Sequence, residues 1–140
     1  MALKASELTV GDVHEAVLVE DLKRTQIVQY AGASGDYNPL HTDEVFTTEV
    51  AGYPSVFAHG MLTMGMTGRM LTDHVGDGRL KSFGVRFTAQ VWPGDDLKAS
   101  ATVKELREED GAPVAEFTVE TRNQDDAVVL SGYATARLDP

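Results

Sequence analysis

The chain of 140 residues contains no cysteine. It therefore cannot form a disulfide bond, bind zinc through thiolates or use a cysteine nucleophile, and packing alone must stabilise its fold. Basic residues are also scarce, with 12 Lys and Arg against 22 Asp and Glu, which gives a net charge of -10. A field of that sign repels nucleic acids and anionic membranes, so we expect neither as a partner.

Long hydrophobic runs are missing as well. No stretch approaches the roughly 18 apolar residues of a membrane span. Met1 to Val10 lacks the basic start and apolar centre of a signal peptide, so we expect a cytoplasmic protein. The composition, 42% hydrophobic and 24% charged, is typical of a folded protein, and the length predicts a single domain over residues 1–140.

The first half of the sequence predicts one strand followed by two short helices. Val13 to Leu22 partly alternates and is rich in Val and Leu, which favours a strand. We expect one helix to be capped by Thr25 and to end in the glycines between Gly32 and Gly35. A second helix should follow, capped by Thr42.

The segment from His59 to Val75 predicts a helix that is buried on most sides, because it is apolar or small nearly all the way round. Gly65 and Gly68 each disfavour a helix by about 1 kcal/mol relative to alanine, so we expect a sheet or a ligand close to both. Beyond Gly78 the sequence alternates between apolar and polar residues, and turn signals separate four expected strands: Ser82 to Val91, Leu97 to Glu105, Val114 to Thr121 and Ala127 to Leu138. This order predicts an α+β fold in which an antiparallel sheet of about five strands, the last four forming a meander, wraps around one long buried helix.

The reactive residues concentrate between Ser34 and His41. Asp36 and His41 are separated by an Asn38-Pro39 turn, and a tight loop can bring their side chains into one pocket. A carboxyl and an imidazole suit general acid–base catalysis, because histidine titrates near neutrality and an apolar environment raises a carboxyl pKa toward the same range. From spacing alone, a plain loop turn with an incidental histidine remains the alternative.

A second candidate site lies at the start of the buried helix, in Ala58-His59-Gly60-Met61-Leu62. Free N–H groups and the positive end of the helix dipole favour an oxyanion there, and Gly60 permits close approach. A thioester carbonyl held at this point would have its enolate stabilised while a neighbouring carbon gains or loses a proton. For His59 itself we expect a capping or packing role.

The stretches Tyr30-Ala-Gly-Ala-Ser-Gly-Asp-Tyr-Asn-Pro-Leu-His41 and Ala58-His-Gly-Met-Leu62 resemble the signature of the MaoC-like hydratases, the (R)-specific enoyl-CoA hydratase family of the hotdog fold. Phe87 and the segment from Trp92 to Leu97 are similar to a later strand of that family and its Pro-Gly-Asp turn. The resemblance covers most of the chain and implies a single hotdog domain.

The resemblance implies a hydro-lyase that reversibly hydrates trans-2-enoyl thioesters to (R)-3-hydroxyacyl thioesters. Asp36 and His41 would form the catalytic dyad, Asn38 would orient it, and the Gly60 amide would bind the thioester oxygen. Met61 is expected in the substrate site, where it shapes a channel for the acyl chain, unless the methionines only fill the core. A serine of some relatives aligns with Gly68 here, so no role is carried over to that position.

No cofactor or metal is expected beyond the substrate itself, an acyl-CoA or acyl-ACP thioester, and the four histidines show no paired ligand spacing. The resemblance implies a homodimer joined edge to edge, or a hetero-oligomer with another hotdog subunit. Four alternatives stay open: a 3-hydroxyacyl-ACP dehydratase of fatty acid synthesis, an acyl-CoA thioesterase, a subunit active only with a different hotdog partner, and a non-catalytic binding subunit. An acidic carrier protein would need a local basic surface, for which Arg69, Arg79, Lys81 and Arg86 are candidates if folding brings them together.

Overall fold

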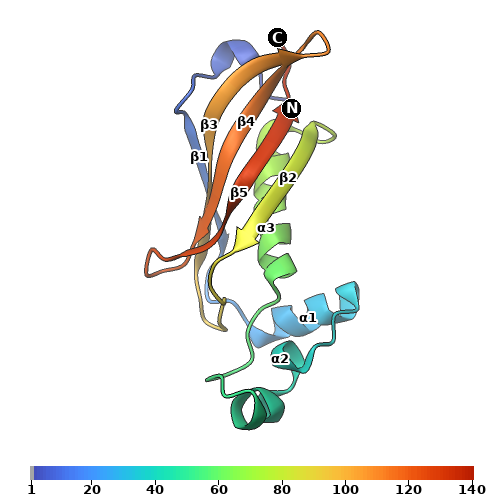
Figure 1. Ribbon diagram of the computed structural model, residues 1–140, viewed down its shortest axis with the longest axis vertical. Helices are drawn as coiled ribbons and strands as arrows, with labels where there is room; N and C mark the ends of the chain where they lie inside the picture. Colours follow the sequence, from blue (N-terminus) through green and yellow to red (C-terminus); the bar gives the residue numbers. More distant parts are fainter. Residues whose placement is uncertain (1) are drawn as a thin grey trace.

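The computed structural model describes residues 2–140. Its strands are β1 (Val13–Val19), β2 (Leu80–Phe87), β3 (Leu97–Glu109), β4 (Ala112–Arg122) and β5 (Val128–Arg137). Its helices are α1 (Arg24–Ser34), α2 (Pro39–Thr42) and α3 (Gly60–Val75), with the short helical turns η1 (Ala5–Glu7) and η2 (Phe46–Val50). The strands form one antiparallel sheet that lies against α3, while α1 and α2 gather beyond one end of it (Figure 1). The predicted α+β fold, a five-stranded sheet around one long helix, is confirmed.

The order of the strands corrects the predicted meander of four. The sheet runs β1-β3-β4-β5-β2, so only β3, β4 and β5 follow one another, and β2 pairs with β5 at an edge. The connection between β2 and β3 covers residues 88–96 and can reach about 30 Å, whereas three strand spacings need only about 14 Å. Part of this connection, Thr88 to Val91, was predicted as strand.

Two of the hairpin turns form where turn residues predicted them. Asp110 and Gly111 join β3 to β4 with φ of 51° and 76°, the left-handed pair that a two-residue hairpin turn requires. Between β4 and β5, Asn123 Oδ1 accepts hydrogen bonds from the backbone N–H groups of Asp125 at 3.0 Å and Ala127 at 3.1 Å. Local side-chain chemistry therefore fixes the pairing of the last three strands.

Small side chains on the inner face of the sheet let it close around α3. The inward-facing alanines are at most 1% exposed: Ala99, Ala101, Ala115, Ala134 and Ala136. Larger side chains from the helix, among them Met70, Leu71 and Val75, fill the space above them together with Phe117. A register shift interrupts each strand pairing, and such irregularities increase the local twist with which a sheet curves around a helix.

The two glycines inside α3 have different surroundings. A Cβ added at Gly68 would lie 3.3 Å from the Phe83 ring, so the absence of a side chain allows β2 to pack closely against the helix. Gly65 is exposed, and an added Cβ there would have no heavy atom of residues 2–140 within 4 Å apart from its helical surroundings. The expected sheet neighbour is therefore present at Gly68 and absent at Gly65 among the described residues.

The predicted caps of the short helices are wrong although both helices exist. α1 begins at Arg24 after Lys23, which makes no side-chain capping bond, and it ends as expected at Gly35 with a φ of 78°. The second predicted helix corresponds to the segment that contains η2 and not to α2. The carboxylate of Asp43, not Thr42, caps this segment by accepting the N–H of Phe46 at 3.1 Å. Among the helices that the structure describes, none has the length and apolar character to cross a membrane.

Candidate active site

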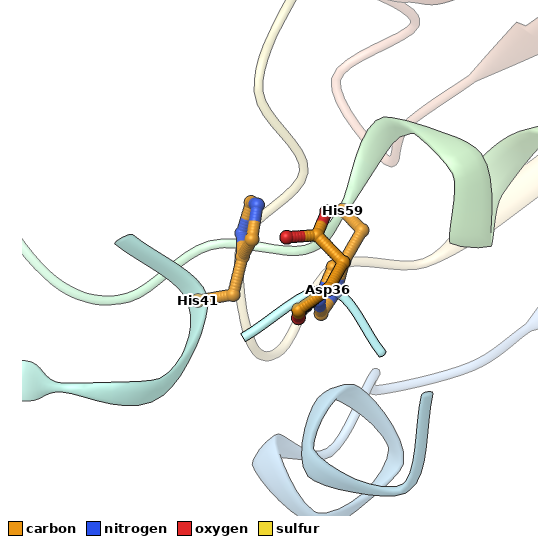
Figure 2. A group of neighbouring side chains, drawn as sticks. All are labelled: Asp36, His41 and His59. Atoms are coloured by element: carbon orange, nitrogen blue, oxygen red, sulfur yellow. Dashed lines mark hydrogen bonds between the residues drawn. The ribbon is translucent and has the colours of Figure 1, made fainter. Parts of the chain in front are cut away.

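Three side chains meet where α1, α2 and the start of α3 come together. Asp36 lies in the loop after α1, His41 in α2, and His59 directly before α3. A carboxylate oxygen of Asp36 and one ring nitrogen of each histidine lie within 4.8 Å of one another. Figure 2 shows the Asp36 carboxylate extending toward the His41 ring. The structure thus brings the two predicted dyad residues together and adds His59.

Asn38 connects the Asp36 carboxylate to the short helix that carries His41. Its N–H donates to Asp36 Oδ1 at 3.3 Å, and its own Oδ1 accepts the N–H of Leu40 at 3.0 Å, which begins the single turn of α2. Pro39 occupies the first helical position, where a missing N–H removes no hydrogen bond. This Asn-Pro turn therefore fixes how the carboxylate and the imidazole face each other.

The hydrogen bonds of His41 determine which ring nitrogen is free. Its Nδ1 lies 2.6 Å from the carbonyl oxygen of Phe57, and because a carbonyl only accepts, Nδ1 carries the hydrogen. Burial lowers the pKa of His41 below 6.5; the adjacent His59 acts in the same direction, while the bond to Phe57 and the charge of Asp36 oppose it. His41 is therefore neutral at pH 7, and its Nε2 can accept a proton.

His59 supports both members of the pair. Its ring stacks on that of His41, with centroids 3.9 Å apart at 27°, and it is 1% exposed. Its Nε2–H donates to the backbone oxygen of Asp36 at 2.9 Å. The side chain makes no capping hydrogen bond, so the expected capping role is wrong and the packing role is confirmed. Sequence reasoning missed the bond to Asp36, because its partners are 23 positions apart and no local pattern links them.

The segments that carry these residues are tied to each other. Glu44 accepts hydrogen bonds from Arg24 of α1 and from the N–H of Val56, which precedes α3. The Arg24 guanidinium holds the pKa of the Glu44 carboxyl below its usual value. The buried Thr47 hydroxyl lies 2.9 Å from the carbonyl oxygen of Pro39, which anchors the start of α2.

A cavity of about 320 Å³ opens beside Gly60, between the start of α3 and the chain that follows β2. The Phe87 ring packs over Gly60: a Cβ added there would lie 3.1 Å from three of its ring atoms. Phe57, whose carbonyl holds His41, also lines this cavity. Met61 does not belong to the described lining of this cavity, and its side chain is 54% exposed in the single chain.

Asp36, His41 and His59 are also residue types that bind metal ions. His41 Nδ1 and His59 Nε2 already bond to backbone oxygens, so His41 Nε2, His59 Nδ1 and the carboxylate are the remaining ligand atoms. Because an imidazole lone pair lies in the ring plane, stacked rings direct their lone pairs side by side and not at one ion. The cluster suits proton transfer better than metal binding, although its residues would be the ones to hold a cation.

The four basic residues predicted to contact the carrier do not form one patch. Arg79 and Lys81 line a common hollow that also includes Glu109 and Arg137, whereas Arg86 lines a separate hollow on the sheet. Three of the four candidates are paired with carboxylates: Arg69 with Asp73, Arg79 with Asp139 and Lys81 with Glu109. Little unpaired positive charge is therefore concentrated at any one of these places.

Comparisons with known proteins show which sequences and folds the chain resembles. The profile described as a MaoC like domain matches residues 6–125. The mitochondrial 3-hydroxyacyl-[acyl-carrier-protein] dehydratase of Arabidopsis thaliana is 33% identical over 135 residues, which cover 94% of this chain and 78% of that protein. The 3-hydroxyacyl-thioester dehydratase Y of Mycobacterium tuberculosis is 45% identical over 67 residues, 46% of this chain and 23% of that longer protein.

Among solved structures, the (R)-hydratase from A. caviae involved in PHA biosynthesis superposes with a TM-score of 0.83. It is 28% identical in sequence, and the match covers 96% of this chain and 99% of that one. Several other matched relatives are much longer proteins, of which this chain spans between 11% and 32%.

Proposed function

Because the chain belongs to the family of MaoC-like domain proteins, we propose that it is a hydro-lyase that reversibly hydrates trans-2-enoyl thioesters to (R)-3-hydroxyacyl thioesters. The observation that carries the proposal is the meeting of the Asp36 carboxylate with a His41 ring whose Nε2 is free to accept a proton. Both lie close to the start of α3, whose first residue is Gly60.

In the proposed reaction, Asp36 and His41 Nε2 hold one water molecule. One of the two takes a proton from the water as its oxygen bonds to C3, and the electrons of the double bond move toward the thioester carbonyl. The proton is then returned to C2, so that the sum is the addition of one water. In reverse, the same groups dehydrate a 3-hydroxyacyl thioester. General acid–base catalysis of this kind contributes about 10²- to 10⁴-fold to a rate.

The Gly60 N–H is proposed to bind the thioester oxygen as it gains negative charge. Gly60 is the first residue of α3, so its N–H has no partner within the helix and adds to the positive end of the helix dipole. A donor fixed in this way stabilises charge that develops during the reaction. Asn38 would act by orienting the dyad, because its N–H donates to Asp36 Oδ1 and its own Oδ1 accepts the N–H of Leu40, the residue before His41.

We propose that coenzyme A carries the acyl group of the substrate. The second candidate is acyl carrier protein, which would make the chain a 3-hydroxyacyl-ACP dehydratase. The similarity to the plant 3-hydroxyacyl-[acyl-carrier-protein] dehydratase favours the second candidate. Against it, an acidic carrier protein needs a basic docking surface, and the basic candidates are divided and mostly paired with acids. Comparing hydration of crotonyl-CoA and crotonyl-ACP by the same preparation decides between the two.

We further propose that residues 1–140 act as one cytoplasmic domain that needs no cofactor and works as a homodimer. Two features support the dimer: β2 is an edge strand, which can pair with a second copy, and Asp36 is exposed in the single chain although acid–base groups work best when enclosed. Light scattering gives the mass in solution, and mixing with EDTA before the assay tests the metal independence.

The direct test is hydration of crotonyl-CoA by the purified chain, with the configuration of the product determined. We expect consumption of the enoyl thioester and formation of the (R)-3-hydroxy product without release of free thiol. Release of coenzyme A would show a thioesterase instead. A chain that is inactive alone, and active only with another hotdog subunit, would contradict the homodimer.

A further inference from the structure

One buried hydroxyl near the start of α3 has no hydrogen-bond partner. Thr63 is 2% exposed, and its Oγ1 is one of two buried side-chain polar atoms of the described residues, with His59 Nδ1, that bond to nothing. Leaving a buried polar group unpaired costs about 1–3 kcal/mol, so native proteins rarely retain one without a use. A methyl group in the same place, as in valine, would remove that cost.

The next threonine on the same helix face shows the contrast. Thr67 is also fully buried, but its Oγ1 lies 3.0 Å from the carbonyl oxygen of Thr63 and 2.7 Å from Thr121 Oγ1 on β4. Its hydroxyl is therefore satisfied inside the protein. Two buried threonines one turn apart thus provide one bonded and one unbonded hydroxyl.

The position of Thr63 relates its hydroxyl to Gly60. Residues three apart lie on the same face of a helix, and helical side chains lean toward the N-terminus, so the Thr63 side chain lies over the first turn. Gly60 and Thr63 both line the 320 Å³ cavity. The remaining wall is mixed: Phe57, Phe87 and Val129 are apolar, whereas Thr88 and Gln90 are polar.

From the unpaired hydroxyl, its place one turn from Gly60 and the shared cavity, we propose that Thr63 is a second hydrogen-bond donor to the thioester oxygen. The inference rests on the proposed function and deepens it. The hydroxyl would strengthen its bond as the oxygen gains negative charge during addition of water to C3. It stays unpaired in the free protein because its partner is the substrate.

The test compares Thr63→Val, which keeps the shape and removes the hydroxyl, with Thr63→Ser, which keeps the hydroxyl. For T63V we expect kcat for crotonyl-CoA hydration to fall about 10- to 100-fold with KM changed less than about threefold, because the lost bond acts mainly on the transition state. T63S should recover most of the lost rate. The melting temperature of T63V should equal or exceed that of the wild type, since no internal bond is removed.

Thr67→Val is the matched control. It should lower the melting temperature, because it breaks two internal contacts, and leave kcat/KM within about twofold of the wild type. Wild-type activity in T63V would overturn the inference and leave the proposed function standing. A T63V protein that loses stability together with activity would show a structural hydroxyl and would also overturn it. A wild-type chain without hydratase activity would overturn the proposed function, and this inference with it.

Discussion

Protonation of His74 should destabilise the fold between pH 6.5 and pH 4. His74, near the end of α3, stacks against His14 of β1 with ring centroids 3.8 Å apart at 6°, and it contacts Phe117 edge-on. Burial lowers the pKa of His74 to about 4, and the neighbouring His14 adds to this effect. In the unfolded chain the same imidazole titrates near its ordinary value of about 6.5.

The sign of the effect follows from which state binds more protons. Above pH 6.5 His74 is neutral in both states and contributes nothing to the pH dependence. As the pH falls toward 4, the unfolded chain takes up a proton that the folded chain refuses, so the free energy of unfolding decreases. A full shift of this size corresponds to about 3 kcal/mol, and solvent screening of a half-buried ring reduces the expected loss to about 1–2 kcal/mol.

Urea denaturation at pH 7.0, 6.0 and 5.0 measures this loss. His74→Phe keeps an aromatic ring between His14 and Phe117 but cannot be protonated, so its free energy of unfolding should vary less over the same range. Some slope will remain, since the pKa of His41 is lowered in the same direction. Equal slopes in the wild type and H74F, or a flat wild-type profile, would refute this account of the His14–His74 pair.

The remaining predictions concern the site and the helix beside it. His59→Phe keeps a ring against His41 but loses the 2.9 Å bond to the Asp36 carbonyl, so we expect kcat to fall about tenfold with the protein still folded; unchanged kcat would mean that the bond does not position Asp36. Because His41 must be neutral to accept a proton and its pKa is lowered, the acid limb of kcat/KM should reach half its maximum below pH 6.5, and a midpoint above that value would contradict the assignment. Gly65→Ala should raise the free energy of unfolding by up to about 1 kcal/mol, whereas Gly68→Ala should gain less, because its Cβ would press on Phe83 at 3.3 Å; urea titration of both variants compares them.

Local patterns predicted the parts of the fold that are locally determined. The helix expected from His59 to Val75 is Gly60–Val75, and the last three strands lie close to their predicted ranges because turn residues such as Asp110-Gly111 separate them. The position of β2 could not be predicted in this way. Alternation indicates that Leu80–Phe87 is a strand, but its partner β5 is chosen by packing around α3, which leaves no mark in the local sequence.

In the candidate site, too, some features follow from the local sequence and others depend on packing. Asp36, Asn38 and His41 lie within one short segment, so a turn could be expected to bring them together, and it does. The bond from His59 to the Asp36 carbonyl and the unpaired hydroxyl of Thr63 depend on how distant segments pack. The side chain of Met61 is exposed in the single chain, and its expected contact with substrate stays a prediction.

The central claim is that Asp36 and His41 together activate one water molecule. Its most direct test is the rate of crotonyl-CoA hydration by Asp36→Asn, which keeps the size of the side chain and removes its ability to take a proton. We predict a fall in kcat of about 10²- to 10⁴-fold with an unchanged melting temperature, and a comparable fall for His41→Ala. Full activity in D36N would contradict the account.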